Sequence, residues 1–180
     1  MISAPFKYWG DFDISFFLRA VSYLDWHQYT ERQEKRFGMQ DTYTIPLIWD
    51  IKLEERKEHP SYNLFKPELE KLSAILNDKL GAGKIFTCVL TKLPAGKQID
   101  LHVDKLDFFS NSSRIHIPII TNDDCIFRVG KETQNMKVGE MWEICNHGML
   151  HGTQNNGTTD RVHLMIDWDY EEVTNFLGGD

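Results

Sequence analysis

The sequence feature that most constrains the fold is a change in residue pattern at Ile85, from helical spacing to strand-forming segments. From there to Trp168 the chain consists of short segments rich in β-branched and aromatic residues, separated by Gly, Asn and Asp. Many short strands punctuated by turn residues are typical of a β-sandwich or a β-barrel. We therefore predict a mainly β fold, with strands over residues 85–93, 99–103, 114–121, 125–129, 134–138, 140–145 and 161–168.

The part of the chain before these strands predicts helices. Apolar residues recur at helical spacing over 11–26, where Asp11 or Asp13 can cap the first turn. The same spacing recurs over 67–80, and Pro67 suits a first-turn position because an N–H there would have no helical partner. Each segment has one apolar face, so each is expected to pack against a sheet.

Three further segments complete the N-terminal part. Residues 29–37 predict a short exposed helix, and the highly charged residues 51–60 predict a solvated loop. Residues 42–49 predict a strand. Pro46 places that strand at the edge of a sheet, because proline donates no ladder hydrogen bond.

Length and composition fit one globular domain. The 180 residues are 41% hydrophobic and 12% aromatic, which is enough to bury a core. We expect a single domain over 1–180, in which a helical part, 1–83, packs on a β core, 84–170. The net charge of −7 and the lack of a basic stripe argue against nucleic-acid binding through phosphate neutralisation.

The cysteines and the N-terminus bear on location. Cys88, Cys125 and Cys145 are an odd set without C-x-x-C spacing, which argues against a disulfide framework and favours a reducing cytoplasm. The N-terminus lacks the apolar region of a signal peptide, and no apolar run approaches the length of a membrane span. We therefore predict a cytoplasmic protein without a membrane partner.

The strand-forming region carries three candidate metal ligands. His102 and Asp104 are two residues apart, so they point to the same side of an extended segment. A second strand that supplies His151 would complete a set of two imidazoles and one carboxylate. This set occupies one face of an octahedron and leaves the other open, as in non-haem Fe(II) oxygenases. Arg161, ten residues after His151, would add a cation that can hold the far carboxylate of a dicarboxylate cosubstrate.

Alternation along two of the predicted strands indicates a polar cavity. In the strand that begins at Arg114, isoleucines share one face, and Arg114 and His116 share the other. In the strand that begins at Arg161, an apolar face stands opposite Arg161, His163 and Met165. A sheet face open to water usually carries Lys, Glu, Thr and Ser instead. Two Arg-x-His pairs on two strands suit a small anion better.

Five short stretches follow the same order as in a known family. They are LPAG (93–96), RIHIP (114–118), VGEMW (138–142), NNG (155–157) after His151, and RVHL (161–164). With these stretches the region from about 85 to 168 resembles the aspartyl/asparaginyl β-hydroxylase family of Fe(II)/2-oxoglutarate oxygenases, which includes bacterial proline hydroxylases. The animal members lack the metal-binding carboxylate, whereas Asp104 is present here, so the resemblance favours the bacterial amino-acid hydroxylase branch.

The resemblance implies a double-stranded β-helix, a cupin-like jelly roll, with N-terminal helices. Its implied cofactors are Fe(II) and the cosubstrate 2-oxoglutarate. Arg161 would hold the C5 carboxylate of 2-oxoglutarate, Arg114 and His116 would flank the C1 carboxylate, and His163 would stand behind them. The implied substrate is an amino acid, free or in a peptide, hydroxylated with molecular oxygen while succinate and CO2 are released. The three implied metal ligands are His102, Asp104 and His151.

Other readings of these residues remain open. A cupin-like metalloenzyme that does not use 2-oxoglutarate would keep the metal ligands but not the role of Arg161. A non-catalytic β-sandwich binding module would keep the fold but bind no metal, and its histidines would be structural. His147 lies in an Asn-His-Gly turn and is interpreted as a loop residue. Residues 105–113 are either a lid over the site or a surface loop with an aromatic anchor.

Overall fold

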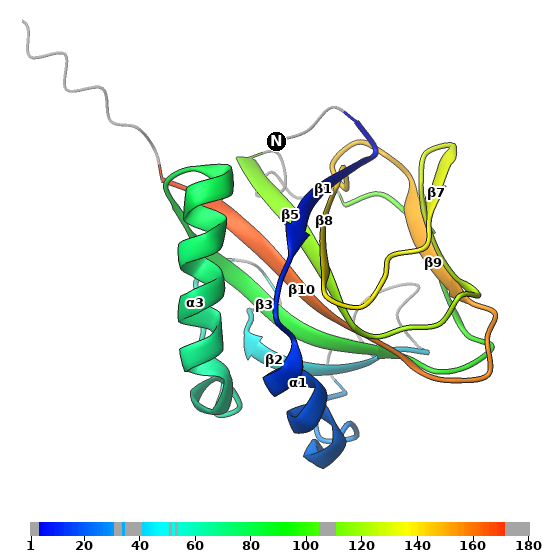
Figure 1. Ribbon diagram of the computed structural model, residues 1–180, viewed down its shortest axis with the longest axis horizontal. Helices are drawn as coiled ribbons and strands as arrows, with labels where there is room; N and C mark the ends of the chain where they lie inside the picture. The colour runs from blue at the N-terminus through cyan, green and yellow to red at the C-terminus, as the bar shows by residue number, and fades with distance from the viewer. Residues whose placement is uncertain are drawn as a thin grey trace, which may run out of the picture.

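The structure is a computed structural model that describes residues 4–30, 34, 41–50, 52, 54–104 and 111–171. Two antiparallel sheets form its body (Figure 1). The large sheet has six strands in the order β1 (Phe6–Asp11), β8 (Glu140–Ile144), β5 (Ser112–Ile120), β10 (Arg161–Tyr170), β3 (Gly83–Leu93) and β2 (Tyr43–Ile48). The small sheet has four, in the order β4 (Gln98–His102), β9 (His151–Asn155), β6 (Cys125–Val129) and β7 (Glu132–Gln134).

The predicted fold class is confirmed: the protein is mainly β and has the double-stranded β-helix architecture. Six of the seven strands expected after Ile85 are present, with ends that differ by at most two residues. The seventh, expected at 134–138, was predicted wrongly, because β7 ends at Gln134 and residues 135–138 form no strand. The pairing stops there because the side chain of Asn135 turns inward and donates to backbone carbonyls, including that of Cys125 at 2.7 Å.

The N-terminal part contributes strands as well as helices. β1 was not predicted, and it pairs with β8 at one edge of the large sheet. β2 pairs with β3 and forms the opposite edge, which confirms the edge position predicted from Pro46. The N-terminal part of the chain therefore supplies both edge strands of the large sheet.

Both predicted helices exist, but their starts were predicted wrongly. The first, α1, covers only Ser15–Ala20 and continues as a 3-10 turn, because residues up to Asp11 are held in β1. The second, α3, covers Tyr62–Leu80, so Pro67 lies inside the helix and not in its first turn. The helix expected at 29–37 and the possible lid at 105–113 fall largely outside the described residues. Within the described part of the chain, no helix is long and apolar enough to span a membrane.

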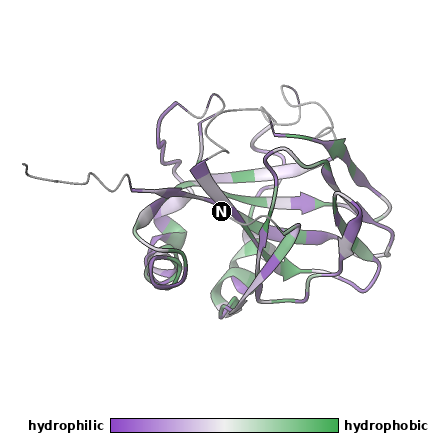
Figure 2. Ribbon diagram, turned by 90° about the horizontal axis from the view of Figure 1, so that it is seen from above, coloured by the Kyte–Doolittle hydropathy of each residue, from purple (hydrophilic) through white to green (hydrophobic). Residues whose placement is uncertain are grey.

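The main core lies between the helices and the large sheet. Figures 1 and 2 show α1 and α3 on the side of the large sheet that faces away from the small sheet. Phe17 of α1 stacks on Phe65 of α3 with ring centroids 5.2 Å apart, and both are fully buried. The apolar residues of β10 point into this core, and they are Val162, Leu164, Ile166 and Trp168.

The other face of the large sheet lines the interior of the β-helix. On β10 this face carries Arg161, His163 and Met165, as the alternation predicted, and then Asp167. All four side chains are buried. The polar interior therefore lies between the two sheets, with the hydrophobic core behind it.

Candidate metal and anion site

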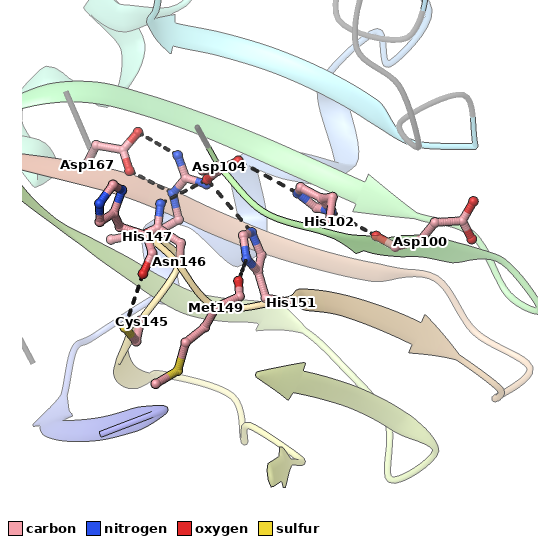
Figure 3. A network of polar contacts seen from close by, with 10 residues as sticks. Asp100, His102, Asp104, Cys145, Asn146, His147, Met149, His151 and Asp167 are labelled. Carbon is pink, nitrogen blue, oxygen red and sulfur yellow. Dashed lines mark hydrogen bonds and ion pairs between the residues drawn. The ribbon is translucent and has the colours of Figure 1, made fainter. Parts of the chain in front are cut away.

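Two histidines and one aspartate converge at the end of the small sheet. His102 is the last residue of β4 and His151 is the first residue of β9, and the antiparallel register places them opposite each other. Their ring centroids are 4.3 Å apart. Asp104 follows β4, and one ligand atom from each of the three residues lies within 4.8 Å of the others (Figure 3). The structure thus brings together the three residues predicted to bind a metal.

Backbone carbonyls fix both imidazoles in the tautomer that a metal requires. Nδ1 of His102 lies 2.8 Å from the carbonyl oxygen of Asp100, and Nδ1 of His151 lies 3.1 Å from that of Met149. Because a carbonyl only accepts, each Nδ1 must carry the proton and each Nε2 is left with a lone pair. This is the usual orientation of metal-binding histidines.

The Nε2 atom of His151 needs a partner. It is buried, and no residue in the described part of the chain forms a hydrogen bond with it. Burial also lowers the pKa of His151 to about 4, so the ring is neutral at physiological pH. A buried nitrogen lone pair directed at a carboxylate 3.7 Å away fits a cation held between the two.

Asp104 is ionised, and hydrogen bonds fix one of its two oxygens. Its Oδ2 accepts hydrogen bonds from Nη1 of Arg114 and from Nδ2 of Asn146, the latter at 2.9 Å. Its Oδ1 lies 3.8 Å from Nε2 of His102. Burial alone would raise the pKa of Asp104, but the positive charge of Arg114, the neighbouring imidazoles and the hydrogen bond from Asn146 together outweigh burial and lower the pKa to about 2. The ionised Oδ1 is therefore directed at the imidazoles.

Arg114 is neutralised by two acids. Its Nε and Nη2 donate to the two oxygens of Asp167 at 2.7 and 3.1 Å, and its Nη1 donates to Asp104. The β5–β10 register places Arg114 opposite Asp167. At least three of the five guanidinium N–H groups are thus directed at carboxylates. Burial opposes the charge, but the two carboxylates raise the pKa of Arg114 above its ordinary value.

Arg161 has a different environment. It is 2% exposed, and in the described part of the chain no carboxylate oxygen lies within 4.0 Å of it. Its Nη2 bonds to Nδ1 of His163 at 2.8 Å, and its guanidinium carbon lies 5.7 Å from the centre of the Phe127 ring. Burial lowers its pKa to about 10. A buried cation without a counter-ion is costly, which suits a site that receives an anion.

One pocket joins the metal-ligand cluster to Arg161. Its empty volume is about 410 Å³, which includes solvent at its mouth. His102 and His151 come from the small sheet and the two arginines from the large sheet, so the pocket spans both layers. Its polar lining consists of His102, Arg114, His116, His151, Arg161, Thr91 and Thr153, and its apolar lining includes Ile99, Phe127, Ile144 and Met165.

Gly152 explains how β4 and β9 come close enough to place the imidazoles together. A Cβ atom at this position would lie 2.7 Å from the carbonyl oxygen of Ile99. Such a contact would push the two strands apart, so only glycine fits directly after His151.

Three residues complete the comparison with the sequence predictions. His147 is exposed in the turn after β8 and is not part of the ligand cluster. Asp167 and Asn146, which support the site, were missed. The signal for Asp167 was present, because it is the next residue on the face that carries Arg161. Asn146 lies in a turn and carried no signal of its own.

Comparisons with known proteins bear on this site. The sequence model of a family described as Aspartyl/Asparaginyl beta-hydroxylase matches residues 18–170. A search of curated proteins found none that matches. The protein is similar in structure to HygX from Streptomyces hygroscopicus, solved with nickel and 2-oxoglutarate bound. The identity is 12%, the TM-score is 0.64, and the match covers 94% of this chain and 84% of HygX.

Two other solved structures share the fold. An oxidoreductase of the 2OG-Fe(II) oxygenase family from Burkholderia pseudomallei is 15% identical, with a TM-score of 0.60 over 71% of this chain and 67% of its own. A prolyl-4-hydroxylase from Pseudomonas putida is 11% identical, with a TM-score of 0.55 over 94% of each chain. These likenesses show a common fold. Because the family match spans most of the chain and agrees with the motifs, this chain belongs to the aspartyl/asparaginyl β-hydroxylase family and is an enzyme.

Proposed function

We propose that the protein is an Fe(II)- and 2-oxoglutarate-dependent hydroxylase that acts on an amino acid, free or in a peptide. One observation supports this most directly. The imidazoles of His102 and His151 line a single pocket beside the Asp104 carboxylate, and the same pocket is lined by a buried guanidinium that has no acid partner in the described part of the chain. An oxo acid with a second, distant carboxylate would match both the metal-ligand cluster and the guanidinium.

The donor set fits Fe(II). His102, Asp104 and His151 would hold the metal through two nitrogens and one oxygen, and the unpartnered Nε2 of His151 supports that assignment. When bound, the metal and 2-oxoglutarate supply the activation of molecular oxygen and the oxidising equivalent for hydroxylation, with succinate and CO2 as co-products.

The protein contributes binding, orientation and exclusion of water. Arg161 would bind the C5 carboxylate of 2-oxoglutarate through paired N–H donors in a buried environment, where such bonds are strong. His116 lines the same pocket and would flank the C1 carboxylate. The side chains of Phe127, Ile144 and Met165 would keep bulk water away from the reacting end.

Arg114 serves mainly as a support in this proposal. The resemblance assigned it to the C1 carboxylate of 2-oxoglutarate, and it does line the pocket. However, its bonds to Asp104 and Asp167 are already charge-assisted and buried. We assign it the orientation of Asp104, with any contact to the cosubstrate secondary to that role.

Anaerobic binding measurements test the proposal. We expect one equivalent of Fe(II), 2-oxoglutarate binding that depends on the metal, and a visible charge-transfer band once both are present. Arg161→Ala should abolish 2-oxoglutarate binding and keep the metal. Succinate release would then be measured with a panel of amino acids and peptides. Stoichiometric metal binding without 2-oxoglutarate binding would reject the proposal in favour of a cupin-like metalloenzyme that does not use 2-oxoglutarate. If the protein binds no metal, a non-catalytic binding module would be the remaining interpretation.

A further inference from the structure

Among the described residues, the Arg161 guanidinium forms one hydrogen bond, and its partner is His163. The two residues are two apart on β10, so their side chains share one face, and Nη2 of Arg161 lies 2.8 Å from Nδ1 of His163. A guanidinium only donates hydrogen bonds, so Nδ1 must be the acceptor and the proton of the ring must be on Nε2. His163 is therefore a neutral imidazole in a fixed tautomer.

The surroundings of His163 favour this neutral form. The ring is fully buried, and burial together with the charge of Arg161 lowers the pKa of His163 well below its ordinary value. The ring of His116, at a centroid distance of 5.8 Å, adds to the same effect. No acid that could stabilise an imidazolium is bonded to His163 in the described part of the chain.

His163 contacts Arg161 from the side away from the metal cluster. Arg161 lines the main pocket and also a small cavity behind it, whereas His163 lines only the small one. That rear cavity has room for about one water molecule. His163 and Thr121 line it, and neither the Nε2 atom of His163 nor the hydroxyl of Thr121 has a hydrogen-bond partner within the described residues.

The two arginines of the pocket differ in the charge of the groups that hold them. Arg114 is held by two carboxylates and its charge is compensated. Arg161 is held by a neutral acceptor and by the face of Phe127, so it is oriented without being neutralised. The same sheet thus carries one arginine built as a support and one whose positive charge is kept available.

We propose that His163 is a positioning residue: its neutral Nδ1 orients the Arg161 guanidinium toward the main pocket and leaves the charge uncompensated, which selects an oxo acid with a distal carboxylate. This rests on the proposed function, because it takes Arg161 as the partner of that carboxylate. The specificity for a dicarboxylate then depends on the acceptor behind the arginine as well as on the arginine.

Three substitutions separate orientation from charge. His163→Phe keeps an aromatic ring but removes the acceptor. His163→Asn places a neutral amide oxygen near the position of Nδ1, and His163→Asp places a carboxylate of the same shape there. The full-length protein, loaded with Mn(II) without oxygen, would be titrated with 2-oxoglutarate. The matched control is 2-oxopentanoate, in which a methyl group replaces the distal carboxylate.

We expect the Kd of 2-oxoglutarate to rise at least about tenfold in His163→Phe and in His163→Asp, and to stay within about threefold in His163→Asn. The Kd of 2-oxopentanoate and the affinity for Mn(II) should be the same in all four proteins. Unchanged 2-oxoglutarate binding in the Asp variant would overturn the inference, and so would equal losses for the two oxo acids.

The Asn and Asp variants differ by one amide, so their comparison holds even where the Phe variant folds poorly. Failure of the proposed function looks different. In that case the wild-type protein itself would bind no metal or no 2-oxoglutarate. If wild type binds 2-oxoglutarate and Arg161→Ala loses it, while His163→Asp retains it, the inference about His163 alone is wrong.

Discussion

His102 lies opposite His151 in the register between β4 and β9, and the strands approach so closely that the residue after His151 has no room for a side chain. The spacing of the two histidines proposed as metal ligands is therefore set by a strand pairing, not by a loop. Changes to that pairing should alter metal binding even where no ligand is touched.

Gly152→Ala tests this directly. The added Cβ would meet the carbonyl oxygen of Ile99 at 2.7 Å, and the strands must separate to relieve the contact. We expect a loss of about 1–3 kcal/mol in the free energy of unfolding and a weaker affinity for Fe(II) or Mn(II). Denaturant unfolding and metal titration measure the two effects. Gln154→Ala, an exposed position on the same strand, is the control and should change neither by much. Normal metal affinity in Gly152→Ala would show that the ligands tolerate this displacement.

Asp167→Asn tests the support behind Asp104. The amide retains one acceptor for Arg114 but loses the charge and the second oxygen, so Arg114 should hold Asp104 less firmly. Outer partners of metal ligands typically contribute about 10–100-fold to metal affinity, and we expect a loss in that range. The control is Asp169→Asn on the same strand, since Asp169 pairs with Lys84 at 3.6 Å near the surface and should contribute little. Equal metal affinities in these two variants would contradict the role assigned to Asp167.

The two arginines should have opposite effects on the stability of the metal-free protein. Arg161→Gln removes a buried charge that has no carboxylate partner in the described part of the chain, so we expect unfolding at the same or a higher temperature. Arg114→Gln leaves Asp104 and Asp167 buried without their cation, and we expect a loss of about 3–5 kcal/mol. Calorimetry of the two variants beside wild type distinguishes them. A large loss of stability in Arg161→Gln would mean that Arg161 is mainly structural.

The pH dependence of stability should report the neutral state of His163. Burial lowers the pKa of His163 in the folded protein, whereas in the unfolded chain the ring takes up a proton near pH 6.5. The unfolded state therefore binds more protons below that pH, and acidification favours unfolding. We expect the free energy of unfolding of wild type to fall more steeply than that of His163→Asn between about pH 7 and pH 5. Parallel curves for the two proteins would show that His163 is charged or not titrating in that range.

The sequence predicted the polar face of the large sheet well, because alternation depends only on the geometry of a strand. Arg161, His163 and Met165 lie where the period of two placed them, and extending the same rule by one step would have included Asp167. That Asp167 pairs with Arg114 could not be predicted, because the β5–β10 register is set by the whole sheet. The contribution of Asn146 depends on the same kind of tertiary contact.

The errors at the helix starts have local causes. The apolar spacing over 11–26 was real, but the N–H of Phe12 donates to the carbonyl of Gly139, which keeps the chain extended past Asp11. The start of α3 is fixed by turn hydrogen bonds such as the one from Tyr62 N–H to the carbonyl of His59, upstream of Pro67. A strand that supplies His151 was expected from the ligand set, but β9 was missing from the strands predicted by residue pattern, because its sequence, HGTQN, contains a single β-branched residue. It is extended because β4 and β6 pair with it on both sides.

The division of the pocket between two layers has a mechanical consequence. The small sheet supplies His102 and His151 and the large sheet supplies both guanidinium groups, so a metal with its oxo acid would link two sheets that otherwise meet through side-chain packing. Loading the protein should slow the exchange of amide hydrogens with deuterium in β4 and β9 more than in β3, which lies inside the large sheet.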